Sequence, residues 1–276
     1  MQKQEFRVDV VIVSYNSSGI IRKAIENLPK WAQVIVVDNN SSDDIANALF
    51  ETNARLISLE RNYGFGTACN RGAEIGSAPF ILFLNPDAQI DPEALAHLMC
   101  QLEEHSEWGM IAPKICYSDG SEFFRGMSFF EPELGAPKID DGVGEVYVQS
   151  GSVLLCKRSV FEEVGGFDEN IFLFMEDDDL SYRVRLLGYK LVADRRVSAV
   201  HLHGQSSGSS LKLEKFKALE AERSKIYAAK KHDIAYSVPK QITQARKRLL
   251  RAVLLLDFKR VARNWGRLEA LVEARG

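Results

Sequence analysis

The feature that most constrains the fold is an alternation of apolar runs with helical patterns between residues 8 and 116. The apolar runs are short and rich in β-branched residues, as in VDVVIVSY (8–15), AQVIVVD (32–38) and FILFL (80–84). The segments between them have helical periodicity, as in 20–28, 43–50, 66–75 and 92–104. Strands that alternate with helices form parallel sheets covered by helices. The sequence therefore predicts an α/β fold with a mostly parallel central sheet.

Polar residues follow each of the predicted strands, at the points where the strands end. They are Ser14-Tyr15-Asn16, Asp38-Asn39-Asn40, the stretch 61–64, and Asn85-Pro86-Asp87. Ligands of such sheets bind beyond the carboxyl ends of the strands, so we expect the binding site there.

Asp87 follows a buried strand directly, and Pro86 fixes the direction of the chain before it. A carboxylate held in this way suits a hard cation such as Mg²⁺ or Mn²⁺. The alternative is a turn-forming Asp that caps the next helix, although Asp91 before Pro92 is the better cap.

Two further segments suit the binding of a nucleotide. Asp38 ends its strand and is not needed by the turn after it, so it could bind a ribose or base. The stretch RNYGFGTACNRG (61–72) has three glycines at a strand-to-helix junction, which allows close approach of a ligand. Its spacing is not GxGxxG, so a dinucleotide is disfavoured.

Four adjacent acids, 176–179, open a predicted helix in FMEDDDLSYRVR. The helix dipole favours acids there, but capping needs only one or two of them. A carboxylate crowded by like charges gains proton affinity, which suits a general base. Farther along, AVHLHG offers His201 and His203, of which at most one faces the site if the chain is extended.

The composition is that of a globular protein, with 276 residues of which 46% are hydrophobic and 26% charged. The four cysteines are widely spaced, so we expect neither disulfides nor zinc, and no apolar stretch is long enough to span a membrane. We therefore expect a cytoplasmic protein, with no nucleic-acid partner.

The net charge of −3 hides a marked asymmetry between the two parts of the chain. Residues 211–276 hold 17 Lys and Arg against 7 Asp and Glu, a charge of +10, which leaves −13 for residues 1–210. The basic part has helical patterns with a break near 237–239, and residues 249–263 segregate apolar and basic side chains on a helix. It would pack on the rest of the protein or a second subunit, or bind the inner face of the cell membrane peripherally.

Taken together, these segments resemble the inverting family 2 glycosyltransferases of GT-A fold, and most closely the bacterial rhamnosyltransferase-like branch. The resemblance rests on an ordered series of motifs across residues 7–210, namely VVIVSYNS, VIVVDNNSSD, ERNYGFGTACNRG, FLNPDAQI, the stretch 150–190 and VHLHGQSS. It implies a catalytic domain over 1–210, with a nucleotide-binding part about 1–116 and an acceptor part about 146–210. A helical basic extension would follow over 211–276.

The resemblance also implies roles for individual residues. Asn85-Pro86-Asp87 occupies the place of the family's metal-binding motif, and His201 matches its later metal-contacting histidine. The pair Glu176-Asp177 matches the catalytic segment, with Asp177 as the base. The residues that would contact the nucleotide or its diphosphate are Ser14, Tyr15, Asn16, Asp38, Asn62, Gly64, Asn85 and Asp87.

The activity implied is metal-dependent transfer of a hexose, with inversion, to a saccharide or lipid-linked acceptor in surface polysaccharide or lipopolysaccharide biosynthesis. The donor implied is a nucleotide-diphosphate sugar such as dTDP-rhamnose, a UDP-hexose or UDP-galactofuranose. Two alternatives remain open, a nucleotidyltransferase and a nucleotide-sugar binding module without turnover. The Gly-, Pro- and acid-rich segment 117–145 would be a mobile lid on the acceptor side.

Overall fold

The computed structural model describes residues 7–137, 139, 142–202 and 210–275. Within these residues the chain forms two compact units. The first comprises the described parts of Met1–Asp168 and Asp177–Ser207, and the second those of Glu169–Glu176 and Gly208–Gly276.

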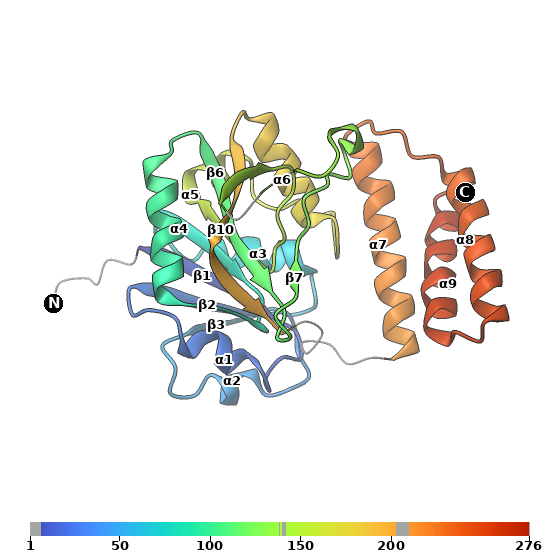
Figure 1. The fold of residues 1–276 in the computed structure, drawn as a ribbon. Helices are drawn as coiled ribbons and strands as arrows, with labels where there is room; N and C mark the ends of the chain where they lie inside the picture. The colour runs from blue at the N-terminus through green and yellow to red at the C-terminus, as the bar shows by residue number, and fades with distance from the viewer. Residues whose placement is uncertain (1–6, 138, 140–141, 203–209, 276) are drawn as a thin grey trace. The chain divides into compact units, whose positions relative to one another are not determined.

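The first unit is built on one sheet, and its helices lie between the strands in the chain (Figure 1). Its strands are β1 (Val8–Ser14), β2 (Ala32–Asp38), β3 (Arg55–Ser58), β4 (Phe80–Leu84), β5 (Ala88–Ile90), β6 (Trp108–Cys116), β7 (Glu122–Phe123), β8 (Val143–Val146), β9 (Val153–Lys157) and β10 (Lys190–His201). Its helices are α1 (Ile21–Glu26), α2 (Ile45–Ala48), α3 (Phe65–Ala73), α4 (Pro92–Glu104), α5 (Arg158–Glu163) and α6 (Glu176–Leu186, which belongs to this unit from Asp177 onward), with a 3₁₀ turn at Pro132–Leu134.

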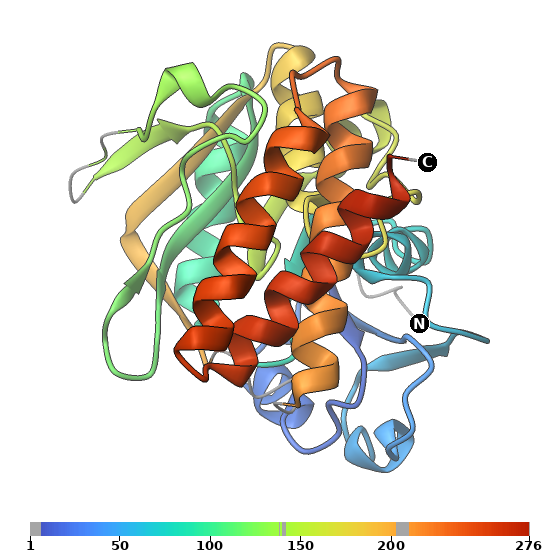
Figure 2. The ribbon, with the colours of Figure 1, turned by 90° about the vertical axis from the view of Figure 1, so that its right-hand side faces the viewer.

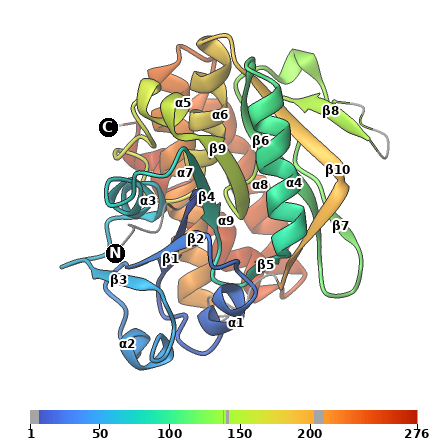
Figure 3. The same cartoon turned by 90° about the vertical axis from the view of Figure 1, so that its left-hand side faces the viewer.

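The sheet has the strand order β3-β2-β1-β4-β9-β6-β10-β5, with β7 beside β6 and β8 beside β10 (Figure 3). The half formed by β3, β2, β1 and β4 is entirely parallel. Strand β9 enters between β4 and β6 antiparallel to both, whereas β6 and β10 are parallel. The sheet is therefore mixed, and the predicted α/β fold with a mostly parallel core is confirmed.

Helices cover both faces of the parallel half, because its strands are apolar on both sides. Val10 and Ile12 of β1 belong to a core with α1, α2 and α4, whereas Val11 and Val13 pack with α3, α5 and α6. All five residues of β4 are buried. Polar side chains are therefore confined to the ends of these strands, where the predicted site residues lie.

The second unit contains three helices among its described residues, α7 (Leu211–Lys231), α8 (Val238–Leu254) and α9 (Phe258–Glu273) (Figure 2). Gly266 permits close packing of α9 on α7, since a Cβ atom there would lie 2.2 Å from the carbonyl oxygen of Lys215. The predicted break near 237–239 is confirmed by the start of α8. None of the described helices is both long and apolar enough to pass through a membrane.

The predicted continuous helix over 249–263 is wrong. Helix α8 ends at Leu254, and Leu256 has a φ of 53°, outside the helical range. Asp257 then caps α9, because its side chain accepts a hydrogen bond from the amide of Arg260 at 2.9 Å. The apolar and basic residues of this stretch therefore surround a turn between two helices.

Candidate active site

Asp87 lies between the end of β4 and the start of β5, and is 3% exposed. Its Oδ1 atom is 3.1 Å from Nε2 of His201, the last residue of β10. The same imidazole nitrogen is 3.4 Å from Nδ2 of Asn85. Pairing of β10 with β5 places His201 opposite Ala88, so the sheet brings His201 to the distant segment that contains Asn85 and Asp87.

The second carboxylate oxygen of Asp87 differs from the first. Oδ2 is buried and has no hydrogen-bond partner among the described residues. A buried carboxylate oxygen without a partner costs free energy, unless a cation or a donor group from a substrate satisfies it. Asp87 and His201 could supply two ligands to a divalent cation, and the described residues contain no cluster of three or more His, Cys, Asp or Glu that could hold one alone.

The predicted nucleotide residues follow β1 and β2, which are neighbours. Ser14 pairs with Asp38 in the parallel register, and the hydroxyl of Ser14 is buried without a partner among the described residues. One oxygen of Asp38 accepts a hydrogen bond from the amide of Ser41 at 3.0 Å, so Asp38 also shapes its own turn. Tyr15 is 47% exposed, and the side chain of Asn16 accepts hydrogen bonds from Ser42.

Asn39 has no predicted role of its own, yet it holds the glycine-rich loop in place. The side-chain nitrogen Nδ2 of Asn39 donates to Oδ1 of Asn62 at 2.9 Å and to the carbonyl of Gly64 at 3.0 Å. Its oxygen accepts from the amide of Tyr63 at 2.9 Å. Gly64 has a φ of 89°, which favours glycine, and precedes α3. Asn39 thus fixes both predicted loop residues beside the end of β2.

Asp177 is paired with Arg125, for which no sequence motif predicts a role. Nη1 of Arg125 lies 3.2 Å and 3.1 Å from the two carboxylate oxygens of Asp177, and its Nη2 contacts Asp178. Arg125 belongs to the segment 117–145. Positions 138, 140 and 141 of that segment lie outside the described residues. The mobility of the segment stays a prediction. This segment also forms ion pairs from Glu122 to Arg195 and from Glu131 to Arg185.

The four acids at the start of α6 are in different environments. Burial and the neighbouring Asp177 carboxylate raise the pKa of Asp178 to about 7, and Arg125 opposes this rise. Asp179 is fully buried and forms an ion pair with Arg183 at 2.7 Å, which gives it a structural role. Glu176 is assigned to the second unit and Asp177 to the first. His203 lies outside the described residues.

A turn before β9 connects the surroundings of Asp87 and Asp177. The amide of Gly151 donates to Oδ2 of Asp177 at 3.3 Å, and the carbonyl of Ser152 accepts from the amide of Asn85 at 2.9 Å. A Cβ atom on Gly151 would lie 3.2 Å from the ring of Phe65, so the turn is closely packed. One backbone turn therefore contacts both acidic centres.

Solved structures of other proteins are similar to this one in fold. One is the structure of GalNAc-T7 with UDP, GalNAc and Mn²⁺ (TM-score 0.62, 16% identity, covering 97% of this chain and 56% of that one). Another is S. aureus TarS, residues 1–349, with a TM-score of 0.58 at 15% identity, where the match covers 98% of this chain and 91% of that one. A third is a Pyrobaculum calidifontis mannosyltransferase with GDP-Man and Mn²⁺, with a TM-score of 0.56 at 16% identity, where the match covers 97% of this chain and 86% of that one.

Sequence comparison identifies relatives and a family. The chain is 28% identical over 236 residues to N-acetylglucosaminyl-diphospho-decaprenol L-rhamnosyltransferase of Mycobacterium tuberculosis, covering 72% of this chain and 77% of that protein. It is 28% identical over 182 residues to the O-antigen chain rhamnosyltransferase WbaN of Salmonella anatum, covering 62% and 57%. The family model for glycosyl transferase family 2 matches residues 9–165, which is more than half of the chain. The chain therefore belongs to glycosyl transferase family 2.

Proposed function

We propose that the protein transfers a hexose from a nucleotide-diphosphate donor to an acceptor hydroxyl, with inversion at the anomeric carbon. The observation that carries the proposal is the pair of acidic centres joined by the turn before β9. Asp87 has a buried oxygen without a partner among the described residues, and Asp177 receives a hydrogen bond from Gly151. The Asp87 centre suits the leaving diphosphate, and the Asp177 centre suits the attacking hydroxyl.

On the donor side, Asp87 and His201 would hold a divalent cation, and Asn85 would lie beside it. The remaining ligands would be oxygens of the donor diphosphate, because two protein ligands do not complete the coordination of Mg²⁺ or Mn²⁺. The cation, when bound, would stabilise the negative charge that develops on the leaving diphosphate. Ser14, Tyr15, Asn16, Asp38, Asn62 and Gly64 would contact the nucleotide.

On the acceptor side, Asp177 would accept the proton of the attacking hydroxyl. The hydroxyl oxygen would bond to the anomeric carbon while the bond to the diphosphate breaks, and the diphosphate would leave with the bonding electron pair. No covalent sugar intermediate is needed, since one displacement inverts the centre. Arg125 would fix the orientation of the Asp177 carboxylate through its two contacts.

The names of relatives support a donor and an acceptor class. Two of them are rhamnosyltransferases, and the name of the mycobacterial protein specifies a diphospho-decaprenol acceptor. Another relative is the succinoglycan biosynthesis protein ExoU of Rhizobium meliloti, at 27% identity over 237 residues. We therefore propose rhamnose as the sugar and a lipid-linked saccharide as the acceptor, in the synthesis of a surface polysaccharide.

The test is a donor panel with the purified full chain. dTDP-rhamnose, UDP-hexoses and UDP-galactofuranose are each incubated with Mn²⁺ or Mg²⁺, with and without a polyprenyl-diphosphate saccharide, and release of the nucleotide diphosphate is measured. Transfer from dTDP-rhamnose that stops with excess chelator is expected. Full turnover in chelator would refute the metal proposal, and transfer from a UDP-sugar alone would refute rhamnose.

The same panel separates the two alternative classes. A nucleotidyltransferase would form a nucleotide sugar from a nucleoside triphosphate and a sugar phosphate, releasing pyrophosphate. A binding module would bind a donor, as measured by calorimetry, without hydrolysing or transferring it. Either result would replace the transferase proposal.

A further inference from the structure

The turn between α8 and α9 exposes a group of large apolar side chains that lie within six positions of the chain. We call this group the apolar tip, and it consists of Val253, Leu254, Leu255, Leu256 and Phe258. Each is at least half exposed, and Leu254 and Leu256 are 74% and 73% exposed. Apolar patches of this kind on a protein surface indicate a site of interaction. The chain breaks its helix here, so the tip projects at a turn rather than along a helix face.

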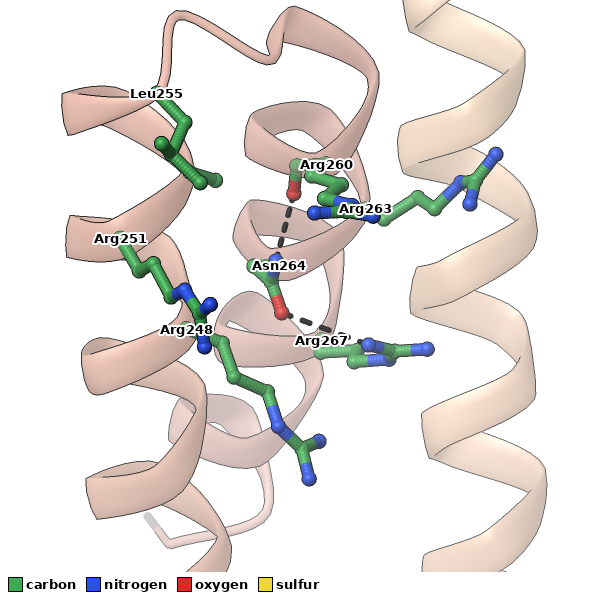
Figure 4. A pocket seen from close by; sticks show the side chains of 8 residues that line it. Arg248, Arg251, Leu255, Arg260, Arg263, Asn264 and Arg267 are labelled. Carbon is green, nitrogen blue, oxygen red and sulfur yellow. Dashed lines mark hydrogen bonds between the residues drawn. The ribbon is translucent and has the colours of Figure 1, made fainter.

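A basic cavity of about 390 Å³ lies beside this tip in the same unit (Figure 4). Among the described residues its lining includes five arginines and one residue of the tip, namely Arg248, Arg251, Arg260, Arg263, Arg267 and Leu255. The first two come from α8 and the other three arginines from α9. We call it the arginine pocket.

The positive charge of the arginine pocket is only partly compensated. Arg263 pairs with Glu214 at 2.5 Å and Arg260 with Asp257 at 3.2 Å. The described residues provide no ion-pair partner for Arg248 or Arg251. A planar guanidinium group can donate two parallel hydrogen bonds to two oxygens of one phosphate. This pocket therefore suits a phosphate group rather than a neutral ligand.

We propose that the α8–α9 turn binds an anionic membrane surface. The apolar tip would enter the acyl-chain boundary, and the arginine pocket would bind a lipid phosphate. Leu255 belongs to both, so the apolar and phosphate-binding parts are contiguous, as the acyl chains and phosphate of a lipid are. Amphipathic protein surfaces with this combination bind anionic lipid interfaces.

A second copy of the chain is a less suitable occupant. In a two-fold symmetric contact the same patch meets itself, so the arginine pockets of both copies would approach each other. Like charges that face each other across an interface oppose association. A lipid phosphate has the opposite charge and therefore complements the pocket. This inference does not depend on the reaction proposed above.

Vesicle sedimentation with the full chain tests the proposal. Vesicles of phosphatidylcholine with phosphatidylglycerol are compared with vesicles of phosphatidylcholine alone. Binding to the anionic vesicles, weakened by added salt, is expected, because salt screens the attraction to the surface. Equal and negligible sedimentation with both vesicles would overturn the proposal.

Paired substitutions locate the binding to the arginine pocket. Arg248→Gln with Arg251→Gln should weaken binding roughly 25-fold, since each basic residue near an anionic surface contributes about a fivefold factor. The control is Arg246→Gln with Lys247→Gln, which removes the same charge from exposed positions of α8 outside the pocket. This control pair should weaken binding several-fold less than the substitutions in the arginine pocket do. An equal loss of vesicle binding in both double variants would contradict a role for the arginine pocket.

A second pair of substitutions tests the apolar tip. Leu254→Ser with Leu256→Ser should weaken vesicle binding at least about tenfold, because transfer of a leucine side chain out of water lowers the free energy. The control is Val272→Ser, which replaces an apolar side chain of α9 that is 51% exposed and outside the tip. Circular dichroism should be unchanged in all variants, since these side chains are exposed. Self-association without vesicle binding, abolished by the leucine substitutions, would instead assign the tip to a second copy.

Discussion

Arg125 Nη1 lies 3.1 Å from one carboxylate oxygen of Asp177 and 3.2 Å from the other, although 52 positions separate the two residues in the sequence. The contact joins the segment 117–145 to the start of α6. Because Arg125 also contacts Asp178, one guanidinium holds two adjacent carboxylates. The orientation of the proposed base is thus set by a residue from another part of the chain.

We expect Arg125→Gln to lower kcat about 10- to 100-fold with little change in donor binding, because a misplaced catalytic group loses rate rather than affinity. The measurement is steady-state kinetics together with calorimetric titration of the donor. Arg185→Gln is the matched control, since it removes another ion pair of the same segment, to Glu131. A similar loss of kcat in both variants would indicate docking of the segment rather than orientation of Asp177.

Asp177→Asn and Asp87→Ala should have different phenotypes. Asp177→Asn removes the proposed base, so turnover should fall about 10²- to 10⁴-fold while donor binding stays nearly intact. Asp87→Ala should weaken donor binding in the presence of Mn²⁺, because it removes a proposed ligand of the cation. Calorimetry and a transfer assay give both quantities. Near-normal turnover of Asp177→Asn would move the base to Glu176, since Asp179 is already paired with Arg183.

The stability of the fold should depend on pH through Asp178. Its pKa is about 7 in the folded protein, mainly through burial, and the ordinary value is 3.8. Between pH 3.8 and about pH 7, Asp178 in the folded chain retains a proton that it has lost in the unfolded chain. The free energy of unfolding should therefore fall as pH rises from 5 to 7.5, and less so in Asp178→Asn.

Urea unfolding at several pH values measures this effect. Asp119→Asn serves as the control, because the hydrogen bonds from Ser121 lower the pKa of Asp119. That carboxylate is ionised in both states between pH 5 and 7.5, so its replacement should leave the slope unchanged. The same slope in Asp178→Asn as in the unsubstituted protein would show that another group titrates.

Arg158→Ala should destabilise the first unit by about 3–5 kcal/mol, because it leaves a buried carboxylate without its partner. Asp9 is fully buried and pairs with Arg158 at 2.6 Å, and Arg158 also donates to the carbonyls of Ala73 and Ala78. Arg71→Ala, which removes an exposed pair with Glu74, should change stability by less than about 1 kcal/mol. Urea unfolding compares the two variants, and equal effects would contradict the role of burial.

The parallel half of the sheet could be predicted because its strands are apolar on both faces and end at polar residues. Asp38 and Asp87 lie at or directly after strand ends, as the alternation of apolar and polar runs indicates. The antiparallel entry of β9 between β4 and β6 could not be predicted in the same way. A short apolar run such as 153–157 specifies a strand but not its neighbours or direction.

Contacts between distant residues limited the prediction of the site. The segment that contains Arg125 has no periodicity, so nothing in it indicates that its arginine reaches α6. The resemblance to known enzymes indicated Asp87 and His201, which contact each other in the structure. The break between α8 and α9 did have a signal, since Asp257 is a residue that favours helix N-caps.

Asn39 uses both ends of its side-chain amide to hold the loop 62–64, and this restricts which amino acids the position can accept during evolution. Aspartate lacks the donor that contacts Asn62 and Gly64, and leucine lacks every polar contact. Glutamine has the same groups on a longer chain, which moves them away from their partners. Related chains that keep this loop should therefore seldom vary at the buried Asn39.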